Sequence, residues 1–329
     1  MAVTIRDVAQ KAGVSISTVS RVLNQTCPVD SDKWSRVEKA VAELGYTPNP
    51  AARSLLSRET GGIGIILPFV SGEFFSEFLV GVDEAAQAED YFLLISTSHH
   101  SPAELKKAMR GMYKRVDGLL VMAPLMSAEQ VNGLAPDGQH FVFANTRSEN
   151  GKQDSITFDN YGGMYAMTMH LISKGHRRIG FITGPMEAYD AMERLRGHEQ
   201  ALEDMGLVKD DSLIISGSYD QKGGFDAALQ LIELKDKPSA IMASNDNAAI
   251  GVLSALQKKG IKIPDEIAVT GFDDVPSALY ANPPLSTVHV PVRELGSASI
   301  RLLIARLRGE SEGTEVRTLP VDLRIRRTS

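Results

Sequence analysis

The sequence predicts a protein of two parts: a small all-helical head, followed by a larger α/β body made of two doubly wound parallel-sheet lobes. Three observations lead to this prediction. The first 45 or so residues carry apolar residues at helical spacing. From Gly61 onward, short continuous apolar runs alternate with amphipathic segments, as in a parallel sheet covered on both faces. The chain has 329 residues, which is more than one hydrophobic core usually holds.

The head, residues 1–47, is expected to contain three short helices. Thr4 can cap the first helix, and the break Ala12-Gly13 ends it. Ser15 can cap the second helix and Asp30 the third. The apolar stripe of the third helix consists of Trp34, Val37, Val41 and Leu44.

The second predicted helix lies in VSISTVSRVLN, residues 14–24, whose first half alternates like a strand. Wound as a helix, it places Val19, Val22 and Leu23 on one side. The other side holds small hydroxyls, one guanidinium and one amide: Ser17, Ser20, Arg21 and Asn24. Such a surface fits a DNA major groove and can contact bases and phosphates. A helix, a glycine turn, a helix and a supporting third helix form a helix-turn-helix, although a solvated polar face on a small bundle is the alternative.

Residues 48–60, PNPAARSLLSRET, are predicted to form a short hinge helix between head and body. Asn49 can cap it, and Pro50 suits a first helical turn. Two turns are too short to be stable alone in water, so we expect this helix to form only when something packs against it. An ordinary linker is the alternative.

The body, residues 61–329, is predicted to form an N-lobe (about 61–160 plus 291–320) and a C-lobe (about 161–290). The strand candidates are GIGIILP (62–68), YFLLIST (91–97), DGLLVMAP (117–124), HFVFAN (140–145), RIGFITG (178–184), SAIMAS (239–244) and EIAVTGFDD (266–274). The end of the chain, LPVDLRIRRTS, is strand-like and has no heptad repeat, so no coiled-coil tetramer is expected.

Polar residues follow several of these strands, and in such sheets ligands bind beyond the carboxyl ends of the strands. The residues are Asn145, Asn245, Asp246, Asp273 and Asp274, together with Arg194 and Tyr219. Carboxylate, amide and guanidinium groups beside an aromatic ring suit a sugar. The alternative is helix capping, which we expect of Asp246 and Asp274. Asp159 and Asn160 are open between capping, lobe crossing and lining the cleft.

Several function classes are disfavoured by the composition. The N-terminus has no apolar signal core and no run is long enough to span a membrane, so we expect a cytoplasmic protein with no membrane partner. A single cysteine, Cys27, excludes an internal disulfide. The seven histidines show no metal-ligand spacing, and no P-loop or complete dinucleotide fingerprint occurs, so we expect no enzyme, no cofactor and no metal. Residues 1–60 carry eight Lys and Arg against six Asp and Glu, within a chain of net charge -6, so only the head is suited to a polyanion.

The motifs identify a family resemblance. TIRDVAQKAGVSISTVSRVLN (4–24) and LGYTPNPAARSL (44–55) resemble the DNA-binding head of the LacI/GalR family of bacterial transcription regulators. The similarity continues through SKGHRRIGFITGP, ERLRGHEQAL, ASNDNAAIGVLSAL and IAVTGFDD, so it covers nearly the whole chain. The body also looks like the periplasmic sugar-binding fold.

This resemblance implies two sets of site residues. Ile16 and Ser17 would read bases, Arg21 would make a third contact, and Leu55 would wedge into the minor groove. The implied DNA-binding set is Thr4, Ser15, Ile16, Ser17, Thr18, Ser20, Arg21, Asn24, Asn49, Ala52 and Leu55. The implied effector-binding set is Ser71, Phe74, Asn145, Arg194, Tyr219, Asn245 and Asp273.

The expected function is that of a regulator, and specifically a repressor, which binds a palindromic double-stranded operator as a homodimer. A small polar effector, a sugar or sugar derivative, would control it, with a nucleobase as the alternative. Asn145 stands where relatives often have aspartate, and Val290 where many have glutamine. The competing interpretation is a solute-binding protein of the periplasmic type without a regulatory role.

Overall fold

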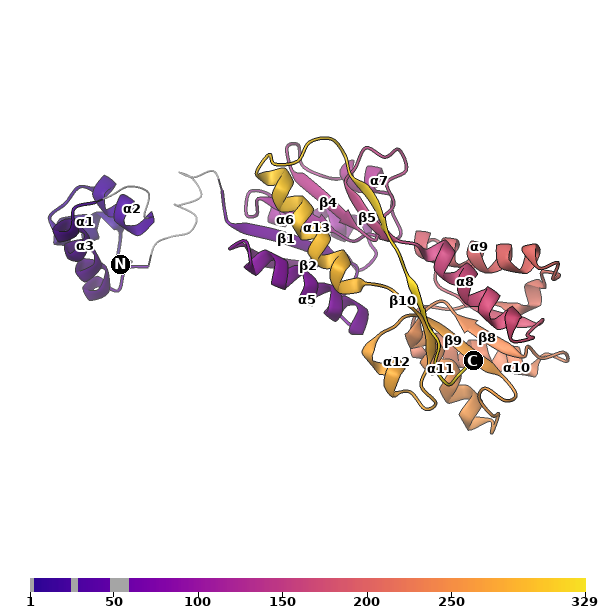
Figure 1. The fold of residues 1–329 in the computed structure, drawn as a ribbon. Helices are drawn as coiled ribbons and strands as arrows, with labels where there is room; N and C mark the ends of the chain where they lie inside the picture. The colour runs from indigo at the N-terminus through magenta and orange to yellow at the C-terminus, as the bar shows by residue number, and fades with distance from the viewer. Residues whose placement is uncertain (1–2, 25–28, 48–58) are drawn as a thin grey trace. The chain divides into compact units, whose positions relative to one another are not determined.

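The computed structural model describes residues 3–24, 29–47 and 59–329. The chain separates into two compact units, Met1–Thr60 and Gly61–Ser329, which are described in turn (Figure 1). Of the predicted hinge helix, residues 48–60, all but the last two residues lie outside the described residues, as do Asn49, Ala52 and Leu55.

The head contains the three predicted helices, α1 (Ile5–Ala12), α2 (Ile16–Asn24) and α3 (Ser31–Leu44). At the start of α1, the amide and hydroxyl of Thr4 both donate to the Asp7 carboxylate, at 2.8 and 2.7 Å. Ser15 Oγ accepts from the Thr18 amide at 3.2 Å, and Asp30 caps α3. Each helix therefore begins at the capping residue that the sequence predicts.

A small apolar core fixes the angle between these helices. Val8, Val19 and Val37 are fully buried at its centre, one from each helix. The side chain of Arg36 on α3 donates to the carbonyls of Ala12 and Gly13, so α3 also holds the turn between α1 and α2. Gly13 has φ 62, a conformation that glycine adopts without strain.

The body contains two six-stranded sheets, which confirms the predicted pair of doubly wound lobes. The N-lobe sheet has the order β11-β5-β4-β3-β1-β2 and the C-lobe sheet the order β12-β10-β9-β8-β6-β7. Every described pair is parallel except β10 with β12. The N-lobe strands are β1 (Gly62–Leu67), β2 (Phe92–Thr97), β3 (Gly118–Val121), β4 (His140–Ala144), β5 (Ser155–Phe158) and β11 (Val316–Leu319). The C-lobe strands are β6 (Ile179–Thr183), β7 (Ile214–Ser216), β8 (Ala240–Ala243), β9 (Ala268–Asp273), β10 (Ser286–His289) and β12 (Asp322–Arg324).

All seven strand candidates form strands, and the strand-like tail supplies β12. Four strands were not predicted from the sequence, each only three or four residues long: β5, β7, β10 and β11. Such short segments give too few residues for a periodic pattern to emerge.

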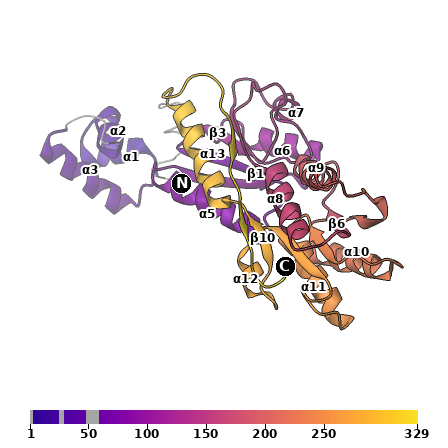
Figure 2. The ribbon, with the colours of Figure 1, turned by 45° about the vertical axis from the view of Figure 1, so that its right-hand side comes forward.

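Helices cover both faces of each sheet. In the N-lobe, α5 (Glu73–Gln87) and α13 (Val292–Leu307) lie side by side on one face, while α6 (Pro102–Met112) and α7 (Ala128–Asn132) cover the other (Figure 2). In the C-lobe, α8 (Asn160–Ser173) and α9 (Tyr189–Asp204) pair on one face, and α10 (Gln221–Glu233) and α11 (Asp246–Lys258) on the other. The remaining helical segments are η1 (Asp211–Leu213) and α12 (Pro276–Tyr280).

Strand β1 shows why both faces are apolar. Ile63, Ile65 and Leu67 point to the α5 side, while Ile66 points to the α6 side and packs with Met109. Because neighbouring residues of a strand point to opposite faces, a strand covered on both sides needs a continuous apolar run.

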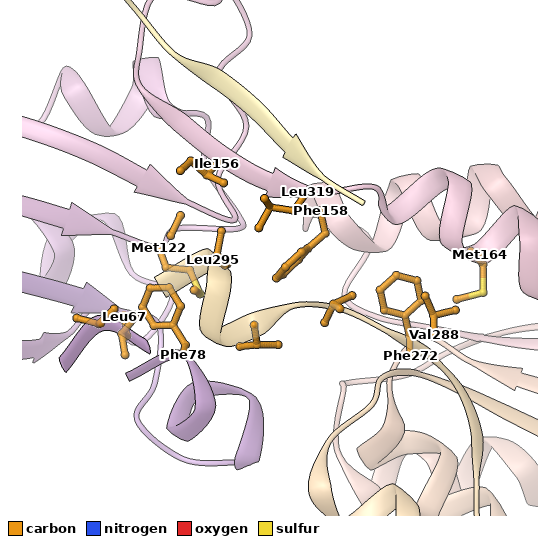
Figure 3. Packing of buried hydrophobic residues seen from close by; sticks show 14 of the residues in the cluster. Leu67, Phe78, Met122, Ile156, Phe158, Met164, Phe272, Val288, Leu295 and Leu319 are labelled. Carbon is orange, nitrogen blue, oxygen red and sulfur yellow. The ribbon is translucent and has the colours of Figure 1, made fainter. Parts of the chain in front are cut away.

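The chain crosses between the lobes three times, after β5, β10 and β11. Apolar side chains continue through this connection: Phe158 and Leu319 lie between Phe78 of the N-lobe and Phe272 of the C-lobe (Figure 3). The last residues of the chain belong to the C-lobe, where Val269 N donates to Thr328 O at 2.8 Å. None of the helices in the described ranges is both long and apolar enough to cross a membrane.

Candidate functional site

A cavity of about 470 Å³ lies between the two lobes of the body. Its N-lobe wall comes from the segments that follow β1, β2, β3 and β4, and its C-lobe wall from those that follow β6, β7, β8 and β9. In both lobes the strand order reverses next to the first strand, with β1 between β2 and β3 and β6 between β7 and β8. Ligands of open α/β sheets bind at such switch points, so the topology itself creates the cavity.

All seven residues of the predicted effector set line this one cavity: Ser71, Phe74, Asn145, Arg194, Tyr219, Asn245 and Asp273. They come from both lobes and span more than half of the sequence. Their role in ligand binding stays a prediction, but their convergence is a geometric fact of the fold.

Arg194 on α9 is the central side chain of the C-lobe wall, with its side chain only 3% exposed. Its Nε donates to Asn160 Oδ1 at 2.9 Å and its Nη1 to the Ser244 carbonyl at 2.5 Å. The guanidinium stacks on the Phe272 ring, with Cζ 3.8 Å from the ring centroid. Asn160, left open in the sequence analysis, therefore holds Arg194 in place, while Asp159 caps α8.

Asp273 ends β9 and faces the same guanidinium, with Oδ1 3.5 Å from Arg194 Nη2. Burial raises the pKa of the Asp273 carboxyl to about 7, against the opposing effect of Arg194 and with help from the negative charge of Asp190. The carboxyl therefore exchanges its proton near neutral pH, and a ligand that donates to it favours the ionised form.

Four cavity residues hold the backbone in the left-handed region. His100 has φ 56, Asn145 has φ 46, Tyr219 has φ 61 and Asp273 has φ 109. Such conformations are uncommon for residues other than glycine and cost energy unless surrounding contacts impose them. Their concentration at one cavity is typical of a functional site.

Two polar atoms in the wall are buried without a hydrogen-bond partner among the described residues: Asn145 Oδ1 and the Tyr219 hydroxyl. Burial and the nearby Asp190 charge raise the pKa of Tyr219, so the phenol keeps its proton. Buried polar groups are normally hydrogen-bonded. An unpaired acceptor and an unpaired hydroxyl are therefore what a polar ligand would satisfy.

The prediction that Asp246 caps the helix after β8 is wrong. Asn245 is the N-cap of α11: its Oδ1 accepts from the Ala248 amide at 2.9 Å, and its Nδ2 donates to the Tyr219 carbonyl at 3.0 Å. Asp246 is fully buried and accepts from the Thr287 hydroxyl and the Val275 amide. The helix begins one residue earlier than expected, which gives Asn245 a structural role in fixing Tyr219.

The prediction that Asp274 caps a helix is also wrong, because Val275 holds the N-cap position of α12. Asp274 instead accepts from Arg326 at 2.6 Å, and its other oxygen lies 3.0 Å from His289 Nδ1. Asp273 and Asp274 face different partners, but the backbone is not extended there, since both residues have a positive φ.

Several wall residues were not predicted from the sequence. Asp190 lies in the first turn of α9, with Oδ2 3.9 Å from Arg194 Nη2. His100, Phe69 and Phe75 line the N-lobe side, where the His100 and Phe69 rings meet edge to face at 4.6 Å. An acidic residue in a first helical turn looks like a capping residue, so nothing in the sequence marked Asp190. Nowhere in the described part of the chain do three or more His, Cys, Asp or Glu residues cluster in a way that could hold a metal.

In the head, the side of α2 opposite the core is open. Val19 and Val22 are buried, whereas Ser17 and Arg21 are exposed and Ile16 is 45% exposed. Ser15 Oγ lies 2.8 Å from both Ser17 Oγ and Thr18 Oγ1, so three hydroxyls gather at the start of the helix. Thr18 and Ser20 are half-buried, and the side chain of Asn24 lies outside the described residues.

A helix-turn-helix head with an open second helix, joined in one chain to a two-lobed body with a polar cavity, defines a DNA-binding regulator with a ligand-binding domain. Comparisons with known proteins agree. Residues 4–49 match the family described as "Bacterial regulatory proteins, lacI family", and residues 168–329 match "Periplasmic binding protein-like domain".

Individual relatives match over nearly their whole length. The "HTH-type transcriptional repressor PurR" of Photobacterium profundum is 34% identical over 99% of this chain and 98% of its own. The lac repressor dimer bound to operator and the anti-inducer ONPF has a TM-score of 0.90 at 27% identity, covering 100% of this chain and 99% of that one. The transcriptional regulator CelR in complex with cellobiose has a TM-score of 0.76 at 28% identity, over 99% and 100% of the two chains. The chain belongs to the LacI family of bacterial transcription regulators.

Proposed function

We propose that this protein is a transcriptional repressor that binds a palindromic operator as a homodimer and that a sugar or sugar derivative in the interlobe cavity controls this binding. One observation carries the proposal: seven residues chosen from the sequence as effector ligands converge on one cavity in a chain that also has a DNA-binding head. A regulator of this kind acts in the cytoplasm and needs no enzymatic activity.

The DNA contacts are proposed to come from α2. Ile16, Ser17 and Arg21 are exposed on it, and they offer an apolar surface, a hydroxyl and a guanidinium. An exposed isoleucine can contact a thymine methyl group, while Arg21 can reach a base or a phosphate. Thr4, Ser15, Thr18 and Ser20 are proposed to position the head on the backbone.

The effector contacts are proposed to divide between the lobes. The C-lobe supplies Arg194, Asp273 and Tyr219, which can bind the hydroxyls of a sugar. The N-lobe supplies Phe74, whose ring can cover an apolar face of the ligand. The similarity to a regulator solved in complex with cellobiose supports a sugar, and a nucleobase is the alternative.

Contacts across the cavity offer a route from effector to DNA. Ser277 of the C-lobe donates to Glu73 of the N-lobe from both its amide and its hydroxyl, at 3.2 and 2.5 Å. The Tyr189 amide donates to the Pro124 carbonyl at 3.2 Å. A ligand that binds both lobes changes the balance of such contacts, and so biases one lobe arrangement over another.

The homodimer is supported by an apolar edge. β2 lies at the edge of the N-lobe sheet, and its Phe92, Leu94 and Ile95 are 55%, 37% and 45% exposed. An open, apolar edge strand is a liability in a monomer, and a second copy of the chain would cover it. Phe92→Asp should yield monomers by analytical ultracentrifugation. A wild-type monomer or tetramer would refute the dimer.

The direct test of the function is selection of binding sites from random duplex DNA by the purified protein. We expect an enriched palindrome, with half-sites one helical turn apart or at a multiple of that spacing, and loss of binding when residues 1–60 are deleted. Specific DNA binding by the truncated body, or no enriched sequence at all, would overturn the proposal. The solute-binding alternative predicts no enrichment, so the same experiment decides between them.

The effector is identified by thermal unfolding against sugars, sugar acids, sugar phosphates and purines. A ligand at about 100 times its dissociation constant adds about 2.7 kcal/mol of stability, which is easily detected. Stabilisation by a sugar together with a changed operator affinity is expected. If only a purine stabilises the protein, the sugar is wrong and the effector is a nucleobase.

A further inference from the structure

We propose that the interlobe cavity is built for an uncharged polyhydroxylated ligand and that Asp190 is the residue that excludes anionic ligands such as sugar phosphates and sugar acids. This inference rests on the proposed function, since it specifies the chemistry of the effector. It comes from the charges in the cavity wall.

The wall carries more negative than positive charge. Arg194 is the single Lys or Arg among the described residues that line the cavity, whereas three acids line it: Asp190, Asp220 and Asp273. Asp220 is ionised, because the Gly223 amide donates to it and lowers its pKa. Burial lowers the pKa of His100, which therefore adds no positive charge at neutral pH. Even with Asp273 protonated, two carboxylates oppose one guanidinium.

Arg194 is also poorly available to an anion. Its Nε and Nη1 are bound to Asn160 and to the Ser244 carbonyl, at 2.9 and 2.5 Å. Its Nη2 faces two carboxylates, Asp273 at 3.5 Å and Asp190 at 3.9 Å. A phosphate would need this outer edge of the guanidinium for a bidentate contact, and the protein's own acids already neutralise it.

Helix N-termini would ordinarily favour an anion here, because three C-lobe helices begin at the cavity. At each of them, however, the chain supplies its own acceptor. Asp190 lies in the first turn of α9, Asp220 is the N-cap of α10, and the side-chain amide oxygen of Asn245 caps α11. The positions that an anionic ligand would take are therefore occupied by acidic side chains at α9 and α10 and by an amide at α11.

An uncharged polyol, in contrast, fits the wall as it stands. Its hydroxyls can donate to Asp190, Asp273 and the unpaired Asn145 Oδ1, and one can accept from the Tyr219 hydroxyl. The ligand keeps its hydrogen bonds on leaving water and brings no net charge into a site that repels anions.

Asp190 is the acid to change. It is 8% exposed, and its Oδ1 accepts from the Ala191 amide at 2.9 Å, which leaves Oδ2 toward Arg194. Asparagine keeps the shape and an oxygen that can accept from the Ala191 amide, but it removes the charge. Asp273 and Asp220 are less suitable, since Asp273 has a strained backbone and Asp220 is the N-cap of α10.

The experiment is a calorimetric titration of inorganic phosphate into the full-length protein, with the ionic strength held constant by chloride. We expect no saturable binding to wild type at millimolar phosphate, and at least tenfold tighter binding to Asp190→Asn. Asp190→Ser provides a second neutral variant should the first fail to fold. Glu104→Gln is the matched control, because Glu104 is an acid in the first turn of α6 and is absent from the cavity wall. It should behave as wild type.

Saturable phosphate binding by wild type would overturn the proposal, as would neutral Asp190 variants that gain no affinity over wild type and the control. Glucose, glucose 6-phosphate and glucuronate form a second arm. Tighter binding of either anion than of glucose to wild type would also contradict the inference. No DNA is present in these titrations, so a negative result here does not contradict the proposed DNA-binding function. A failed operator selection, in turn, does not contradict the proposal that Asp190 excludes anionic ligands.

Discussion

Replacing His198 by glutamine is expected to make the body less sensitive to acid. His198 is 2% exposed and stacks on Phe181, with ring centroids 4.8 Å apart. The hydroxyl proton of Thr168 goes to the Met164 carbonyl at 2.8 Å, so its oxygen accepts from His198 Nδ1 at 3.1 Å. Burial in this apolar setting lowers the pKa of His198 from 6.5 to about 4.

The sign and size of the effect follow from proton linkage. Above pH 6.5, the pKa of the imidazole in the unfolded chain, His198 is neutral in both the folded and the unfolded protein and does not lower the free energy of unfolding. As pH falls from there toward about 4, the unfolded chain takes up a proton that the folded protein excludes, so stability is lost. At about pH 5 roughly 1.5 pKa units of the shift are in effect, which is about 2 kcal/mol at about 1.36 kcal/mol per unit.

The assay is urea unfolding of wild type and His198→Gln, followed by circular dichroism at about pH 7.5 and about pH 5. The variant should be less stable than wild type at the higher pH, because it loses the ring packing against Phe181. Between the two pH values, however, it should lose about 2 kcal/mol less than wild type does. Equal losses in the two proteins would refute the assignment of a buried neutral imidazole.

Three other substitutions test the remaining architecture. Ile16→Ala should leave thermal stability nearly unchanged, since the side chain is 45% exposed, but weaken operator binding by about 1 kcal/mol in a fluorescence anisotropy titration. Gly81→Ala places a Cβ about 2.1 Å from a backbone carbonyl of α13 and should lower the melting temperature, whereas Gly111→Ala, with open space around it, should not. Arg194→Met removes the donor that Asn160 Oδ1 and the Ser244 carbonyl bind inside the protein, and should cost about 2 kcal/mol or more in urea unfolding. Unchanged operator affinity would contradict a DNA contact by Ile16. Equal effects of the two glycine changes would contradict the close approach at Gly81, and a fully stable Arg194 variant would contradict a structural role of its buried contacts.

Much of the candidate site follows from the sequence because its residues end parallel strands. Asn145 and Asp273 stand at the carboxyl ends of strands in different lobes, and the doubly wound topology brings such ends to one cleft. The helix starts in the head were also predictable, since capping is a local interaction: the Asp30 carboxylate accepts amides two and three residues away.

Contacts between distant segments could not be predicted in this way. Asp274 looks like a capping residue, and only the folded chain shows that its partner is Arg326, 52 residues later. Asn245 and Asp246 are neighbours of similar capping ability, and the buried Thr287 hydroxyl, 41 residues away, binds the second of them. Local propensity does not distinguish such cases, because the deciding partner lies on another strand.

The sequence by itself determined the family, the two-part organisation, the helix starts in the head and the residues gathered at the cavity, since these depend on local patterns repeated along the chain. The tertiary structure decided the charge balance of the cavity. It brings Asp190 within 3.9 Å of Arg194, directs Arg194 onto the Phe272 ring, and leaves Asn145 Oδ1 without a partner among the described residues. Electrostatic energy depends on distance and burial, and both are set only when the two lobes fold around the same space.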